Sequence, residues 1–188
     1  MPLYPPARPL LPVPVAGQYM IPLSQASTST SSTLGNGTLR LAPIVLERTL
    51  TIDRIGGEIT GAGEAGSVLR LGIYSDNGNA YPNALLLDGG TIDGTSATTQ
   101  VATVSLVLLP GLYWIGGAVQ AAPSSQPTVR IVSNPTIPLA LPLGTGLPGA
   151  GTSAAGFSQA SVTGALPATF SASVSSTGSV PRLLLRAA

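Results

Sequence analysis

The 188-residue sequence contains no cysteine and no histidine, and all eight of its basic residues are arginine. Without cysteine there is no disulfide framework, no thiolate nucleophile and no thiolate metal site. Without histidine, the commonest general base and the commonest transition-metal ligand are both missing. Without lysine there is neither a Schiff base nor a P-loop lysine. We therefore predict a protein with no catalytic residues, no metal and no cofactor.

Charge is also scarce. Only 8% of the residues are charged, for a formal net charge of +1, whereas 44% are hydrophobic. A typical soluble domain has about 25% charged residues. A few scattered arginines cannot neutralise many phosphates, so no nucleic-acid partner is expected. Disorder of the whole chain is not favoured either, because disorder combines low hydrophobicity with high charge.

The chain carries no pattern typical of a membrane span or a signal peptide. It begins MPLYPPARPLLPVPVAG, and these prolines prevent the apolar helix that a signal peptide needs. The longest apolar stretch, from Val104 to Val119, is interrupted by Pro110 and by glycines. It is too short and too broken for a membrane helix of about 20 residues. We expect a soluble protein with no membrane partner, and the lack of cysteine fits a reducing cytoplasm.

Two segments are predicted to precede the folded domain. Residues 1–23 are rich in proline and favour an extended polyproline II arm. Residues 24–37 are rich in serine and threonine and are predicted to be a linker. The arm is also apolar, which indicates docking on a partner chain or on neighbouring copies; a disordered tail, or an arm folded back on its own domain, is the alternative. The candidate partner-binding residues are Leu3, Tyr4, Leu10, Leu11 and Tyr19.

Residues 38–188 show the period-two alternation of β-strands and no helical period over ten or more residues. In the segment 67–74, the side chains of Leu69, Leu71 and Ile73 share the predicted core face. The predicted strands are 38–41, 44–52, 54–60, 67–74, 84–87, 91–92, 100–109, 112–120, 128–133, 157–162, 166–173 and 181–186. We also expect a bulge or bend at Gly56-Gly57, turns at 88–90 and 110–111, and antiparallel pairing of 100–109 with 112–120. The pattern predicts an all-β, jelly-roll-like antiparallel β-sandwich preceded by the extended arm.

The few charges are unevenly distributed. All seven acidic residues lie between Glu47 and Asp93, and the only charges in residues 94–188 are Arg130, Arg182 and Arg186. A half-domain with so few charges is difficult to keep soluble as an isolated monomer. We therefore predict a homo-oligomer, or packing within a larger particle.

Polar turns provide weak candidates for chemistry. The sequence DNGN at 76–79 resembles part of a calcium loop, but the further ligands and the terminal glutamate are missing. Aspartate, asparagine and glycine are also the residues that a β-turn requires, so a turn is favoured there and in the run DGGTID at 88–93. Glu58 with Glu64 or Asp76 could form a glycosidase carboxylate pair, but nothing in the sequence aligns them.

The aromatic residues Tyr74, Tyr81, Tyr113 and Trp114 could provide ring faces for stacking on sugars. Because Tyr113 and Trp114 are adjacent in a predicted strand, their side chains should point to opposite faces. One of the two is expected in the core, and the other on the outer face or at an interface. Tyr81 and Trp114 are the candidate glycan-binding residues.

Several motifs resemble those of bacteriophage tail-fibre and minor tail proteins. RLGIY at 70–74, followed by a polar turn and YPNALL at 81–86, is similar to their "RxGIY" strand and "P-x-x-L" return. LLPGLYWI at 108–115 resembles their "L-x-P-G-x-Y-W" hairpin, and ALPATF at 165–170 with VPRL at 180–183 resembles their closing strands. The resemblance covers roughly residues 38–188. It implies a jelly-roll-like sandwich in a virion appendage, often trimeric.

Together these features predict a non-enzymatic structural protein of a bacteriophage virion, of the minor tail or fibre type. It would be assembled in the host cytoplasm, anchored by its arm and partnered by other virion proteins and copies of itself. Two alternatives remain open. One is a capsid decoration or head-fibre protein, and the other is a carbohydrate-binding module for host cell-surface glycans.

Overall fold

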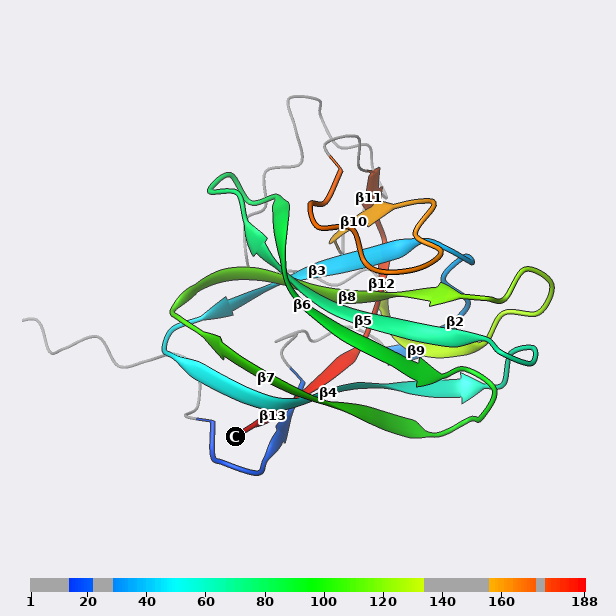
Figure 1. Cartoon of the computed structure of the whole chain (residues 1–188), viewed down its shortest axis with the longest axis horizontal. Helices are drawn as coiled ribbons and strands as arrows, with labels where there is room; N and C mark the ends of the chain where they lie inside the picture. Colours follow the sequence, from blue (N-terminus) through cyan, green and yellow to red (C-terminus); the bar gives the residue numbers. More distant parts are fainter. Residues whose placement is uncertain (1–13, 22–28, 134–155, 172–174) are drawn as a thin grey trace, which may run out of the picture.

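The computed structural model describes residues 14–21, 29–133, 156–171 and 175–188. Within these residues every helix or strand assigned is a β-strand (Figure 1). The strands are β1 (Tyr19–Met20), β2 (Ser29–Ser32), β3 (Leu39–Leu46), β4 (Leu50–Gly61), β5 (Val68–Asp76), β6 (Pro82–Asp93), β7 (Thr99–Leu108), β8 (Gly111–Gln120), β9 (Thr128–Ser133), β10 (Gly156–Gln159), β11 (Ser175–Thr177), β12 (Ser179–Pro181) and β13 (Leu183–Ala187). The predicted all-β class is confirmed.

The strands form two antiparallel sheets. In the first sheet β2 pairs with β9, β9 pairs with the end of β4, and β4 pairs along its other edge with β7. Where β9 and β4 diverge, β12 pairs with β9 and β13 pairs with β4, and β1 lies on the far edge of β13. The second sheet has the order β11-β10-β3-β8-β5-β6.

The two sheets face each other across one apolar core. Leu69, Leu71 and Ile73 of β5 are fully buried there, as the alternation predicted. They belong to the same cluster as Ile52 and Ile55 of β4, which come from the opposite sheet. Two antiparallel sheets that share a core in this way form a β-sandwich.

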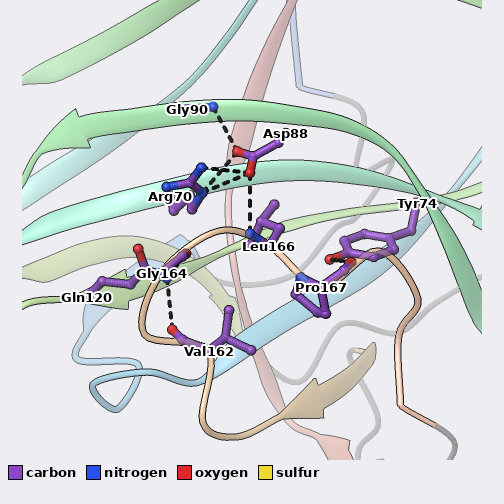
Figure 2. A network of polar contacts seen from close by, with 9 residues as sticks. All are labelled: Arg70, Tyr74, Asp88, Gly90, Gln120, Val162, Gly164, Leu166 and Pro167. Carbon is purple, nitrogen blue, oxygen red and sulfur yellow. Dashed lines mark hydrogen bonds and ion pairs between the residues drawn. The ribbon is translucent and has the colours of Figure 1, made fainter.

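The second sheet also has a buried outer face. Residues 160–171 cross it, and their apolar side chains, together with Phe157 of β10, cover the side of β3, β5 and β8 that points away from the main core (Figures 1 and 2). The buried members of this outer cluster are Leu39, Leu41, Tyr74, Trp114, Ala118, Phe157, Val162, Leu166 and Phe170. Both faces of the middle of this sheet are therefore withdrawn from water.

Some predicted breaks in the strands are absent. β3 continues through Pro43, and β4 continues through Gly56 and Gly57. Pro43 lies past Leu41, the last residue of β3 that pairs with β10 among the described residues, and a strand edge tolerates a residue without an N–H. The bulge expected near Gly56 occurs earlier, between Ile52 and Arg54, where the register of β4 against β7 shifts.

Two predicted turns also have other roles. The run at 88–90 is a bulge inside β6, where the register against β5 shifts and Gly90 has a φ of 75°. The predicted pairing of 100–109 with 112–120 is wrong, because β7 pairs with β4 whereas β8 pairs with β3 and β5. The short connection at 110–111 passes from one sheet to the other. Both edges of β8 are occupied, one by β3 and the other by β5, so no edge is left for β7.

Two further expectations concern segments outside the central strands. Residues 166–171 were predicted to form part of a strand, but they contribute only an isolated bridge between Ala84 and Thr169 because Leu166 and Phe170 pack on a sheet face. The predicted linker, 24–37, includes β2, and Leu34 just after it is fully buried in the main core. Serine and threonine side chains leave the backbone free to pair, so a polar segment can complete a sheet.

Close backbone packing around β8 generates a stability prediction. A Cβ atom at Gly116 would collide with the backbone carbonyl of Arg40 on β3, whereas a Cβ at the exposed Gly164 would meet no atom within 4 Å. We expect Gly116→Ala to lower the free energy of unfolding by about 3 kcal/mol or more, because the backbones must separate. Gly164→Ala should change it by less than about 0.5 kcal/mol. Urea unfolding followed by circular dichroism measures both, and equal midpoints would contradict the packing described.

Candidate functional site

A network of polar contacts fastens segment 160–171 to the outer face of the second sheet (Figure 2). The side-chain amide of Gln120, at the end of β8, donates to the carbonyl oxygens of Val162 and Gly164, both at 2.8 Å. The hydroxyl of Tyr74 on β5 donates to the carbonyl oxygen of Pro167 at 2.9 Å. Burial, together with the nearby charge of Asp88, raises the pKa of Tyr74, so its hydroxyl remains a donor.

Asp88 lies at the centre of this network. Its carboxylate accepts from Nε and Nη2 of Arg70 on the neighbouring strand, at 3.0 and 2.7 Å. It also accepts from the backbone N–H groups of Gly90 and Leu166, at 3.1 and 3.3 Å. Burial alone would raise the pKa of Asp88, but these hydrogen bonds and the charge of Arg70 outweigh it, so its pKa lies below the ordinary range. One carboxylate thus links β5, the bulge of β6 and the crossing segment.

The predicted glycan-binding residues come together in the same outer cluster. Both rings contact Phe157 of β10: Tyr81 is stacked on it with centroids 4.6 Å apart, and Trp114 lies 5.3 Å away. Trp114 is 0% exposed, and its indole N–H donates to Asp76 at 2.9 Å. Tyr113, one residue earlier, packs partly buried against the main core, so the two side chains do point to opposite faces. A sugar cannot reach the Trp114 ring in this arrangement, and only Tyr81 retains some exposure.

The turn that was considered as a calcium loop uses its acid internally. Asp76 accepts from the backbone N–H groups of Gly78 and Ala80 in addition to the indole of Trp114. Glu64 accepts from the backbone N–H of Ser124. Within the described part of the chain, no three acidic side chains lie close enough together to hold a metal ion.

Of the predicted partner-binding residues, Leu3, Tyr4, Leu10 and Leu11 lie outside the described residues. Tyr19 lies in β1, paired with Arg186 of β13, and the Arg186 guanidinium is 5.7 Å from the centre of its ring. The Tyr19 side chain is nevertheless 48% exposed. The end of the predicted arm therefore lies on the domain's own sheet edge, with aromatic surface still facing water.

The three arginines of the acid-free half find their acids on β4. Arg130 and Arg182 both bind Glu58, at 2.8 and 2.9 Å, and Arg186 binds Asp53. The pKa of Glu58 is lowered mainly by the hydrogen bond from Arg130. The pKa of Asp53 is lowered mainly by the hydrogen bond from Arg186. Glu58, which was considered above as a glycosidase acid, thus serves as a structural link between β4, β9 and the β12–β13 run.

The polar network itself was not predicted from the sequence. Gln120 and Asp88 gave no signal beyond a strand end and a turn. Their partners in the crossing segment are backbone atoms of Val162, Gly164 and Leu166, far along the chain. The one available sign was Gln120 at the end of an apolar strand, since a buried amide needs hydrogen-bond partners.

No protein-family model matches this chain, and the search of curated proteins found no match either. Among the described residues there is no helix long and apolar enough to cross a membrane.

The network predicts a defined dependence on pH. The folded-state pKa values of Asp53, Glu58 and Asp88 are lowered, so the stability that their ionised forms contribute is complete above the unfolded pKa values of about 4. It is lost as the pH falls below that range. Urea unfolding at a series of pH values should show a plateau near neutrality and a decline below about pH 4.

The contribution of Asp88 can be separated from the others. At pH 7 we expect Asp88→Asn to cost about 1.5–3 kcal/mol, because the charged hydrogen bonds to Arg70 are lost, and to weaken the acid-dependent slope. Hydrogen exchange should show faster exchange of the Leu166 amide. Asp93→Asn is the matched control, because Asp93 caps a local turn at Thr95 and should leave Leu166 unaffected. Unchanged exchange at Leu166 in both variants would show that Asp88 does not fasten the segment.

Proposed function

We propose that this chain is a non-enzymatic structural protein of a bacteriophage virion, a minor tail or fibre-type protein. In this proposal the proline-rich arm of residues 1–23 anchors the chain to other virion proteins, and a jelly-roll-like sandwich projects from the particle. The chain would be assembled in the host cytoplasm. Capsid decoration uses the same two parts, and it differs only in where on the particle the arm binds.

The observation that carries this proposal is the order of the strands. Eight consecutive strands, β2 to β9, are arranged as β2-β9-β4-β7 in one sheet and β3-β8-β5-β6 in the other. The chain changes sheet at every connection except the β5–β6 hairpin. Two four-stranded sheets linked in this way are the arrangement of the jelly roll, an architecture used by viral capsid proteins and by lectins. This order supports the sandwich that the tail-protein resemblance implies.

The uses of the polar groups favour a structural role. The acids that were considered for catalysis, Glu58, Glu64 and Asp76, are each engaged in holding strands or turns together. The outer face of the second sheet, where a binding groove could have formed, is covered by residues 160–171. The glycan-binding alternative is weakened because Trp114 is buried, and it rests on Tyr81 alone.

The anchor can be tested with the full-length chain in its particle. A variant carrying Leu3→Ser, Tyr4→Ser, Leu10→Ser and Leu11→Ser removes apolar surface from the arm and leaves residues 14–188 intact. We expect the wild-type chain in purified virions, and the variant to be strongly depleted, as measured by immunoblot against the major capsid protein. Thermal unfolding of the two isolated proteins should coincide.

A matched control carries serine at four prolines of the arm, Pro2, Pro5, Pro9 and Pro12, and should be incorporated better than the first variant. Absence of the wild-type chain from purified particles would contradict the virion assignment. Normal incorporation of the first variant would contradict the anchor alone.

A further inference from the structure

The two strands that end the sheets on the β6–β7 side of the sandwich differ in how they are protected. In the second sheet the edge strand is β6, which begins with Pro82, carries Asp88 and Asp93, and shifts register against β5 at three places. Proline, charges and bulges are the devices by which natural proteins prevent an edge strand from pairing with another chain. This edge is therefore blunted.

The corresponding edge strand of the first sheet, β7, has no proline and no charge, and its one irregularity is a register shift against β4 at Val104 and Ser105. Its sequence, TQVATVSLVL, contains no charged residue, no proline and no glycine. Within the described residues it pairs only with β4, so its other edge presents unpaired backbone N–H and C=O groups over about ten residues. Such an edge is a template for pairing with a further strand.

Three of the exposed large apolar side chains lie at the same place. The side chains of β7 alternate between exposed and half-buried, and the exposed set includes Val101, at 41%, and Val107, at 58%. Leu109, directly after the strand, is 62% exposed. Single exposed apolar residues are ordinary, but three of them on one uncharged edge strand and its following turn indicate a contact surface.

The exposed face of β7 is complementary to itself. When two copies pair antiparallel about a two-fold axis at Val104, residue 101 of each copy faces residue 107 of the other, and residue 103 faces residue 105. The exposed Val101 then lies opposite Val107, and the Thr103 hydroxyl lies opposite the Ser105 hydroxyl. Both are favourable cross-strand pairs, and no charge is opposed or buried. The half-buried side chains of Ala102, Val104 and Leu106 lie on the core side of the sheet in both copies, so the apolar face would extend from one copy to the other.

We propose that β7 is a homodimer interface, through which two copies of this chain join their first sheets into one continuous antiparallel sheet. The occupant of the edge is thus β7 of a second copy. This inference rests on the strand edge and not on the virion assignment, so either can fail without the other. A two-fold pairing of this kind gives a dimer, which distinguishes it from the trimer that the tail-protein resemblance implies.

The absence of cysteine allows a direct test of both interface and register. We would prepare the full-length single variants Val101→Cys and Val107→Cys, and oxidise each alone and in an equimolar mixture. The mixture should give a disulfide-linked dimer, because residues 101 and 107 face each other. Each variant alone should not, because its own cysteines lie six residues apart along the paired strands, about 20 Å.

A second measurement does not depend on crosslinking. Sedimentation velocity of the unmodified chain over a range of concentrations should show a monomer–dimer equilibrium. Val107→Lys should shift this equilibrium to the monomer. Each dimer contains two Val101–Val107 pairs, and the substitution places a lysine in both. Val45→Lys is the matched control, since Val45 is similarly exposed, at 42%, but lies on β3 of the other sheet. Circular dichroism checks that both variants are folded.

Three results would overturn the proposal. They are a wild-type chain that stays monomeric or forms a trimer, a dimer that persists in Val107→Lys, and crosslinking that is as efficient in the single variants as in the mixture. The last result would mean that the strands pair in another register or not at all.

Discussion

The second sheet has to bury both of its faces, and much of the molecule is arranged to meet that constraint. On β5, Ile73 points into the main core while Tyr74, its neighbour, points into the outer cluster; on β8, Ile115 and Trp114 do the same. A sheet that is apolar on both sides needs a second cover. Residues 160–171 provide this cover, and Asp88, Tyr74 and Gln120 hold it in place through its backbone. The outer face is thereby lost as a binding platform.

The few charged side chains of this protein are used mainly in ion pairs. Asp53, Glu58 and Asp88 bind five arginines between them. The pairs of Arg130, Arg182 and Arg186 join β4 to β9 and to the β12–β13 run, which come much later in the chain. Half-buried ion pairs of this kind are costly unless each charge is matched. Each of these three carboxylates on β4 and β6 has at least one arginine partner, from β4 itself, β5, β9 or the β12–β13 run. The acid-free second half is consequently not short of partners. Its three arginines are paired with acids of the first half.

The sequence allowed the local structure to be predicted much better than the pairing. Alternation located the strands and correctly assigned Leu69, Leu71 and Ile73 to the core, because the period of a strand depends only on which side is buried. It could not show that β7 and β8 lie in different sheets, because a Pro-Gly turn fits a hairpin and a crossover equally well. The glycines at 89 and 90 indicated a backbone irregularity, but a bulge and a turn favour the same residues, so the sequence did not distinguish them. The role of Asp88 depends on Leu166, and no local pattern encodes a contact over that separation.

The two edge strands β6 and β7 differ in the surface that they present to solvent. The ion pairs lie on sheet faces and at the β6 bulge, whereas the β7 edge carries no charged residue. Association along such an edge depends on backbone hydrogen bonds and apolar side chains, and salt screening leaves both nearly unchanged. A contact made through arginines and acids would weaken as ionic strength rises. For a protein with seven acids and eight arginines, neutral edges are therefore the surfaces on which assembly can be stable over a wide range of ionic conditions.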